Sequence, residues 1–295
     1  MNYDYNQAFF RNIGIFTEEE QNVLRKSTVA VAGAGGVGGI HLATLARMGV
    51  GNFHVADEDV FEIVNINRQY GASVDTFGKN KAEAIAAIVR SINPEAKVTV
   101  FKEFVNAQNI DAFLQGVDVA LDGIDFFEID ARRLYFMTAW KKKIPVVTSG
   151  PLGFGAMLLN FSPFGMNFDE YFGISDSMTY EEKIAAFAVG LTPALLHLKY
   201  LNLGKVDLKA GKGPALASAC ALCAGLASTE AANWILKRTP PLAAPYYFQF
   251  DPYLKRYKKG YLWFGGKNPV QKLKQKILLR RVKRASEMGT VPISS

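Results

Sequence analysis

The sequence predicts an α/β fold built on a doubly wound, Rossmann-like and mostly parallel sheet. Three observations lead to this prediction. Short apolar segments alternate with helical ones from residue 28 to residue 149, a glycine-rich turn follows the first apolar segment, and acidic residues close the second. Such alternation is typical of βαβ units, in which helices cover both faces of a parallel sheet.

The expected core begins after an N-terminal helical segment over residues 1–27. The elements expected in it are strand 28–33, helix 37–48, strand 52–57, helix 79–92, strand 97–101, helix 107–115, strand 117–122, helix 128–142, strand 144–149 and strand 153–163. Helix 79–92 (KNKAEAIAAIVRSI) is expected to stop at Asn93-Pro94, because a residue that precedes proline is driven out of helical conformation. We therefore assign residues 28–163 to one nucleotide-binding core.

The rest of the chain divides into three further parts. Residues 164–213 are less regular, with helices expected near 180–188 and 193–201, and we interpret them as an insertion or lid. An Ala-rich helix over 214–237 and a strand pair within 245–257 are expected to close the core, so residues 214–257 form one unit. Residues 258–295 remain as a basic C-terminal tail.

Composition indicates a globular protein. Of 295 residues 49% are apolar and 21% charged, enough to bury a large core. The N-terminus lacks the basic and apolar regions of a signal peptide, and two cysteines fit a reducing compartment, so we expect a cytoplasmic protein. The longest apolar stretch, 214–236, is interrupted by polar residues such as Glu230, which favours a buried helix and no transmembrane segment.

Positive charge is concentrated in the last 45 residues. Residues 251–295 contain twelve Lys or Arg and two acids, a charge of +10. Because the whole chain carries +7, residues 1–250 carry −3 in total. The basic character therefore belongs to the tail, where QKLKQKILLRRVKR (271–284) predicts a helix with Leu273, Ile277, Leu278 and Val282 on one side and cations on the other. Such a helix could bind RNA, an anionic membrane or an acidic partner, or pack as an ordinary solvated helix.

The glycine-rich turn predicts a nucleotide site. Gly33, Gly35 and Gly38 in VAVAGAGGVGG fit the G-x-G-x-x-G fingerprint, which lets backbone approach phosphate at a helix N-terminus. Asp57 follows nineteen residues after Gly38 and is placed to take ribose hydroxyls. Alone, this pattern also fits proteins that bind NAD or FAD, and Asp57 could be a strand-end turn residue.

Cations and a further acid favour phosphate chemistry over hydride transfer. Arg68 can form forked contacts with phosphate oxygens, and Lys81 opens a helix with a point charge. Asp125, at the end of a strand, can hold Mg²⁺ against phosphate, with Asp122 as its nearest competitor. Ordinary surface charge remains the alternative for Arg68 and Lys81, and loop capping the alternative for Asn65.

The motifs GAGGVG, DEDV, NINRQ, GKNKA and DGID, in that order, resemble the ThiF/MoeB group of ubiquitin-activating-like adenylyltransferases. The resemblance covers about residues 5–160 well and 214–237 loosely. It implies an eight-stranded mixed sheet with an antiparallel extension, a homodimer or pseudodimer, and MgATP. It also implies that a carboxylate attacks the α-phosphate to give an acyl adenylate and pyrophosphate. NxNRQ with VTVFKEFV and DGID is most similar to the branch that cyclises threonylcarbamoyladenosine in tRNA.

The resemblance also implies a role for each matching residue. Gly35 and Gly36 would cover the phosphates and Asp57 would hold the ribose. The residues implied to hold the triphosphate are Asn65, Arg68 and Lys81, with Asp125 positioning Mg²⁺. Arg11, in FFRNIG, aligns with the arginine that this family inserts into the active site of its partner subunit. The substrate would be a small or tRNA-borne carboxylate, or the C-terminus of a small ubiquitin-like carrier protein.

Departures from the family pattern concern metal, thiol and adenine contacts. The single cysteine pair, Cys220 and Cys223, lies in the Ala-rich helix. Two cysteines cannot complete a tetrahedral zinc site, so we expect buried thiols and no zinc. A redox pair is the alternative. No cysteine lies between Asp125 and Ser218, where a thioester-forming member would place its nucleophile. Phe126 stands where Asn is usual, and Val64 where Ser is frequent.

Two functions therefore remain open on the sequence alone. The first is an ATP-dependent enzyme that adenylates a carboxylate. The second is a non-catalytic or NAD-type nucleotide-binding scaffold of the same fold. Arg68, Lys81 and Asp125 favour the enzyme, because a scaffold needs no such set. None of His41, His54 and His197 has a partner at metal-binding spacing, and His41 is expected on the surface of the first core helix or against the sheet.

Overall fold

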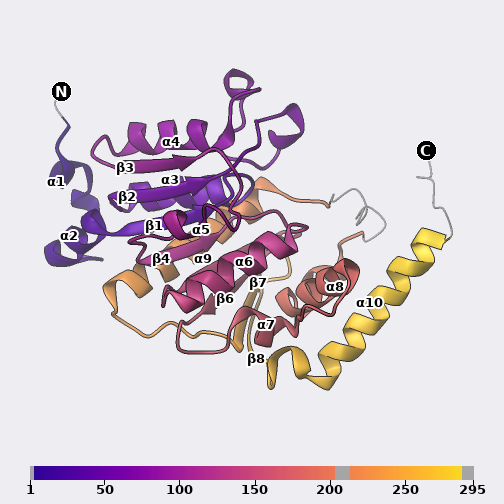
Figure 1. Cartoon of the computed structure of the whole chain (residues 1–295). Helices are drawn as coiled ribbons and strands as arrows, with labels where there is room; N and C mark the ends of the chain where they lie inside the picture. Colours follow the sequence, from indigo (N-terminus) through magenta and orange to yellow (C-terminus); the bar gives the residue numbers. More distant parts are fainter. Residues whose placement is uncertain (1–2, 203–212, 288–295) are drawn as a thin grey trace.

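An eight-stranded mixed sheet forms the centre of the computed structural model, which describes residues 3–202 and 213–287, the last seven by their backbone only. The strands lie in the order β3-β2-β1-β4-β5-β6-β7-β8 (Figure 1). Neighbouring strands from β3 to β5 are parallel, and β6, β7 and β8 continue the sheet in antiparallel fashion. The expected fold class, antiparallel extension included, is confirmed. The strands are β1 (Thr28–Ala32), β2 (Asn52–Ala56), β3 (Lys97–Phe101), β4 (Val119–Asp122), β5 (Val146–Leu152), β6 (Gly155–Phe161), β7 (Tyr246–Asp251) and β8 (Arg256–Tyr261).

Helices cover both faces of this sheet. One apolar cluster joins the sheet to α3, α4 and α9, and another joins it to α5, α6, α7 and α8. In β1, Val29 and Val31 belong to the first cluster and Ala30 and Ala32 to the second, as the alternation of side chains along a strand requires. The helices are α1 (Tyr5–Ala8), α2 (Glu18–Lys26), α3 (Gly38–Arg47), α4 (Lys81–Ile92), α5 (Ile110–Phe113), α6 (Ile129–Lys141), α7 (Phe168–Phe172), α8 (Tyr180–Leu191), α9 (Ala217–Leu236) and α10 (Pro269–Glu287).

Local capping explains where several helices begin. Thr17 and Glu20 form a capping box at α2, and Thr179 and Glu182 form another at α8. Each box satisfies two backbone N–H groups that a helix end would leave without partners. Helix α4 begins after the Asn80 cap and ends before Asn93-Pro94, close to the expected stop.

Helix α9 is long and apolar enough to cross a membrane by length and composition alone. Its contacts instead make it a core helix, since it packs against α3 and against β4, β5 and β6. Nine of its residues, among them Ala227 and Ala231, are buried, and small side chains allow this close packing. The expectation of a buried helix is confirmed.

Several expected elements differ in extent. Helix 107–115 shrinks to α5, and the helix expected over 193–201 is a 3-10 turn, η4 (Leu196–Lys199). The N-terminal helical segment consists of α1, the 3-10 turn η1 (Phe10–Asn12) and α2. Strand β8 continues to Tyr261, so the boundary drawn between residues 257 and 258 lies within a strand. It pairs with β7 from Asp251↔Arg256 to Tyr246↔Tyr261, so the hairpin is longer than the strand pair expected within 245–257. Part of the proposed lid, 203–212, and the end of the tail, 288–295, lie outside the described residues.

Candidate active site

The carboxyl ends of three parallel strands meet at one edge of the sheet. Ala32 of β1 is in register with Ala56 of β2 and with Asp122 of β4. The glycine turn, the acidic DEDV segment and the DGID segment follow directly from these ends, so all three loops lie together. Parallel sheets bind ligands at this edge, where the helix N-termini also point.

Close backbone packing explains two of the glycines. Gly33 has φ +89°, and a Cβ there would lie 2.2 Å from the carbonyl oxygen of Gly123. A Cβ on Gly38 would lie 1.8 Å from the carbonyl oxygen of Gly33. A larger side chain at Gly33 would push the turn away from the segment that follows β4, and one at Gly38 would distort the turn itself.

Gly35 and Gly36 of the turn are not required by packing. A Cβ on Gly35 would lie 3.6 Å from Nε2 of Gln69, and one on Gly36 would lie 3.8 Å from Sγ of Cys220, both ordinary contacts. Their lack of side chains keeps the backbone open at the N-terminus of α3, where N–H groups and the helix dipole favour an anion. The turn therefore has the form of a phosphate cradle.

Asp57 ties the second strand to this turn. Its Oδ2 accepts from the N–H of Ala34 at 2.7 Å, and its Oδ1 accepts from the N–H of Asp59 at 2.9 Å. Burial raises the pKa of the Asp57 carboxyl, while the Ala34 hydrogen bond and the nearby charge of Lys81 oppose that rise. Asp57 thus holds the glycine turn through both of its carboxylate oxygens, at the end of β2.

Lys81 begins α4 and reaches back to the same loops. Its Nζ lies 2.7 Å from Oδ2 of Asp59, and its side chain is largely buried. Asp59 belongs to the DEDV motif, but sequence reasoning did not single it out. The signal was its spacing of two residues from Asp57, which places both acids on one short loop.

Arg68 and Asn65 lie on the turn that includes η2 (Ile63–Asn65). Nη1 of Arg68 donates to the carbonyl oxygen of Val64 and to Oδ1 of Asn67. Oδ1 of Asn65 accepts from the N–H of Glu62, so Asn65 does cap the turn, which was the alternative considered for it. Its Nδ2 amide is the part that could donate to phosphate. Gln69 beside them is buried, and its Oε1 lacks a hydrogen-bond partner within the described part of the chain.

The two acids of DGID have different environments. Asp122 is buried and accepts from Nε of Arg132 at 3.0 Å and from Oγ1 of Thr148 at 2.8 Å. Asp125 is exposed, and its Oδ1 accepts from the N–H of Phe127. The carboxylate of Asp122 is therefore engaged in structural hydrogen bonds, whereas Asp125 retains a carboxylate oxygen for a ligand.

Two side chains near the site depart from the family pattern. Phe126 packs against Phe127 and Phe187, with ring centroids 5.0 and 5.4 Å apart, so its ring belongs to the apolar core. Its carbonyl oxygen accepts from Nη1 of Arg132. Val64 is exposed on η2.

Arg11 is far from the glycine turn of its own chain. It is exposed on η1, and Nδ2 of its neighbour Asn12 donates to the carbonyl oxygen of Met48, at the C-terminal end of α3. The glycine turn lies at the opposite end of this ten-residue helix, about 15 Å away at the usual rise per residue. The structure does not bring Arg11 together with the other candidate residues of one chain.

Cys220 and Cys223 are both buried and unpaired, as expected. Burial raises the pKa of the Cys220 thiol, and the charge of Arg68 opposes that rise. Within the described residues, no three His, Cys, Asp or Glu side chains gather in a way that could hold a metal ion. Cys220 nevertheless lies beside Gly36, so the N-terminal half of α9 forms a wall of the site.

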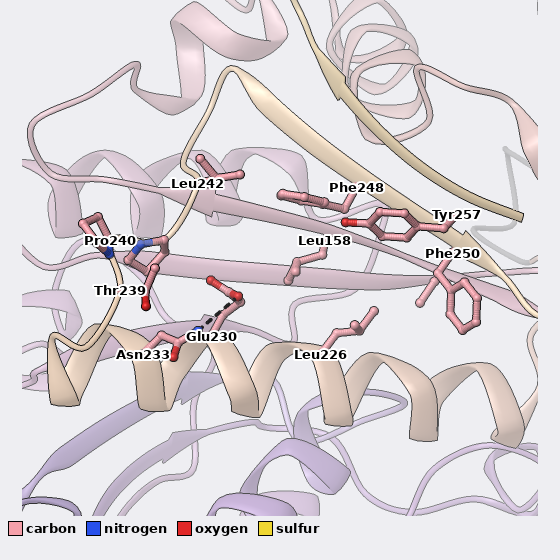
Figure 2. A pocket seen from close by; sticks show the side chains of 12 residues that line it. Leu158, Leu226, Glu230, Asn233, Thr239, Pro240, Leu242, Phe248, Phe250 and Tyr257 are labelled. Carbon is pink, nitrogen blue, oxygen red and sulfur yellow. Dashed lines mark hydrogen bonds between the residues drawn. The ribbon is translucent and has the colours of Figure 1, made fainter. Parts of the chain in front are cut away.

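A separate cavity of about 330 Å³ lies between α9 and the strands β6 and β7. Figure 2 shows Leu226, Glu230 and Asn233 of α9 facing Leu158 and Phe248 across it. Nδ2 of Asn160 donates to Glu230 at 2.9 Å, and burial raises the pKa of the Glu230 carboxyl. Glu230 lies ten residues beyond Cys220 on α9, about 15 Å along the helix, so this cavity is distinct from the glycine turn.

Comparison with known proteins agrees with this geometry. Residues 9–261 match the family described as the ThiF family, and the chain belongs to that family. The tRNA threonylcarbamoyladenosine dehydratase of Haemophilus influenzae is 34% identical over 151 residues, which are 51% of this chain and 57% of that protein. The SAMP-activating enzyme E1 of Haloferax volcanii is 40% identical over 109 residues, 37% of this chain and 40% of that protein.

Solved structures of similar fold include E. coli MccB with ATP. That structure has a TM-score of 0.61 and 20% identity, covering 83% of this chain and 66% of that one. At this identity the likeness concerns the fold alone. The match spans about half the length of the curated tRNA threonylcarbamoyladenosine dehydratases.

Proposed function

We propose that this chain is an ATP-dependent enzyme that activates a carboxylate as an acyl adenylate and releases pyrophosphate. The observation that carries the proposal is the convergence of three kinds of group at one sheet edge. These are an open glycine turn at a helix N-terminus, the cations Arg68 on the turn after η2 and Lys81 at the start of α4, and an exposed carboxylate at Asp125. Membership of the ThiF family supports the same reaction class.

Each group has a distinct task in this reaction. The backbone at Gly35 and Gly36 would receive phosphate oxygens, and Asp57 would accept from ribose hydroxyls. Arg68 and Lys81 would neutralise the triphosphate, where fixed donors stabilise charge that develops as pyrophosphate leaves. An attacking carboxylate oxygen forms a bond to the α-phosphorus while the bond from that phosphorus to the bridging oxygen breaks, and that oxygen departs with pyrophosphate.

The donor set at Asp125 fits Mg²⁺. One protein carboxylate with phosphate oxygens and water is the usual environment of this ion in nucleotide sites. Because Asp122, the first acid of DGID, is engaged by Arg132, Asp125 would be the protein ligand. A bound Mg²⁺ would supply charge neutralisation of the phosphates.

The carboxylate substrate is proposed only as a class. One relative is named for threonylcarbamoyladenosine in tRNA and another for activation of SAMP. The carboxylate activated by this chain would accordingly be carried by a tRNA or by the C-terminus of a small carrier protein. Assembly as a homodimer is part of the same proposal, since Arg11 cannot reach the glycine turn of its own chain.

The proposal is tested by ATP–pyrophosphate exchange in the presence of candidate carboxylates. Arg68→Ala should abolish exchange, whereas Arg90→Ala, which removes an exposed arginine bonded to the carbonyl oxygen of Val98, should not. ATP with Mg²⁺ at about a hundred times its dissociation constant should stabilise the fold by about 2.7 kcal/mol, and NAD⁺ should not. Equal stabilisation by NAD⁺, with no exchange for any carboxylate, would favour the nucleotide-binding scaffold instead.

A further inference from the structure

Helix α10 contacts the rest of the molecule along a side that mixes polar and apolar residues. It packs against α8. Gln271 is buried there, and Nζ of Lys274 donates to the carbonyl oxygen of Pro193 at 2.9 Å. Leu278, one turn further along the same face, is partly buried. Leu279 is partly buried as well, so the packed side of α10 combines glutamine and lysine with two leucines.

The opposite side of α10 carries apolar side chains into solvent. Val270, Leu273 and Ile277 are 57%, 59% and 44% exposed. Residues three, four and seven apart share one helix face, so these three form a continuous apolar row. This corrects the expectation that Leu273, Ile277, Leu278 and Val282 share a side, because Leu278 belongs to the packed face. Val282 lies where side chains are outside the described residues.

A row of cations borders the apolar row. Lys272, Lys276 and Arg280 are exposed and follow one another at four-residue intervals. Between Asn268 and Ser286 the sequence contains no acidic residue. The exposed surface of α10 is therefore apolar along one line and strongly positive beside it. Figure 1 places α10 at the outside of the molecule, beyond α8, where a large surface could contact it.

We propose that α10 docks this protein on an anionic lipid surface. The apolar row would enter the boundary between headgroups and acyl chains, and Lys272, Lys276 and Arg280 would contact lipid phosphates. Helices that bind in the plane of a membrane combine these two features, apolar insertion and positive charge. An RNA duplex would use the cations but has no place for the apolar row of Val270, Leu273 and Ile277.

Two matched sets of substitutions separate the two contributions. Leu273→Gln with Ile277→Gln removes the apolar row without changing charge. Lys272→Gln, Lys276→Gln and Arg280→Gln remove the charge and leave the apolar row. Val74→Gln with Val23→Gln is the control, since both valines are exposed elsewhere, at 77% and 44%. Equal melting temperatures would show that the fold is kept, and ATP-dependent pyrophosphate exchange should be unchanged in every variant.

The measurement is sedimentation with vesicles of phosphatidylcholine alone or of phosphatidylcholine with about 30 mol% phosphatidylglycerol, an anionic lipid that attracts basic segments. The wild-type chain should bind the anionic vesicles at least about tenfold more tightly, and each set of α10 substitutions should reduce that binding about tenfold, with the control unaffected. Equal binding to both vesicles would overturn the proposal. Full vesicle binding by the variant with Leu273→Gln and Ile277→Gln would also overturn it. Competition by an RNA duplex that this variant still binds would point to RNA instead. A protein that binds no vesicles, but whose dimer dissociates on the same substitutions, would show that α10 is a dimer contact.

Discussion

Nζ of Lys81 lies 2.7 Å from Oδ2 of Asp59, and the two side chains differ sharply in exposure, 8% for the lysine and 52% for the aspartate. The ion pair with the solvent-exposed Asp59 thus holds the ammonium group of the buried Lys81 at the loops. An arriving triphosphate would compete with Asp59 for the ammonium group, because both are anionic acceptors at the same place.

This pair predicts unequal effects of two substitutions. Lys81→Met should lower ATP–pyrophosphate exchange by about 100- to 1000-fold, the usual effect of losing one donor to developing charge. Asp59→Asn should lower it by less than about tenfold, since the lysine remains in place. Initial rates at saturating and limiting ATP give the comparison, and equal losses would mean that Asp59 itself contacts the nucleotide.

The two acids of DGID should separate stability from chemistry. Asp122→Ala leaves Arg132 buried without its partner and should cost about 3–5 kcal/mol in the free energy of unfolding. Asp125→Ala removes an exposed carboxylate and should leave stability nearly unchanged while abolishing Mg²⁺-dependent exchange. Urea denaturation and exchange assays on both variants check this, and normal exchange by Asp125→Ala would move the metal site elsewhere.

The glycine turn offers a second matched pair. Gly38→Ala would place a Cβ 1.8 Å from the carbonyl oxygen of Gly33 and should destabilise the fold by about 1–3 kcal/mol, the usual cost of overpacking. Gly36→Ala meets only Sγ of Cys220 at 3.8 Å, so the melting temperature should stay near that of the wild type. ATP binding should nevertheless weaken, because the methyl group obstructs the phosphate approach. Unchanged ATP affinity in Gly36→Ala, measured by calorimetry, would argue against a phosphate cradle there.

His41 predicts a pH dependence of stability. It is fully buried on α3, neither of its ring nitrogens has a partner within the described residues, and burial lowers the pKa of His41 to about 3. The unfolded chain binds a proton at this histidine below about pH 6.5, and the folded chain does not until about pH 3. The free energy of unfolding should therefore fall as pH falls through this window, by up to about 1.4 kcal/mol per pH unit.

His41→Leu should remove this part of the pH dependence and stabilise the chain relative to wild type at pH 5. The difference between variant and wild type, measured by urea denaturation at pH 5 and pH 7.5, cancels the other titrating groups. Parallel pH profiles would show that His41 gains a proton or a partner in the folded state.

Arg11 should act in trans. Because it lies at the far end of α3 from its own glycine turn, an Arg11→Ala chain and an Arg68→Ala chain should each be inactive alone. Mixing them with subunit exchange should restore up to about a quarter of wild-type activity, since half of the dimers would carry one intact site of two. Absence of recovery despite proven exchange, or a monomer at working concentration, would remove Arg11 from the active site.

The local sequence pattern predicted most of the fold and the location of the candidate site. The strands β1 to β5, the glycine turn and α9 follow from apolar runs, glycine spacing and small residues, which act over a few neighbouring positions. The extents of β8 and η4 did not follow, because strand pairing and the packing of 3-10 turns depend on partners far along the chain.

Tertiary structure decided which side chains are free to act. DGID contains two aspartates. Only the contacts with Arg132 and Thr148 show that the carboxylate of Asp122 is engaged within the fold and that of Asp125 is not. The ion pair of Lys81 with Asp59 and the exposed row of α10 likewise depend on which loops and helices meet. The sequence by itself determined which segments carry the candidate residues. Whether each of these side chains is free for a ligand depends on long-range contacts, because they bury one carboxylate of DGID and leave the other in water.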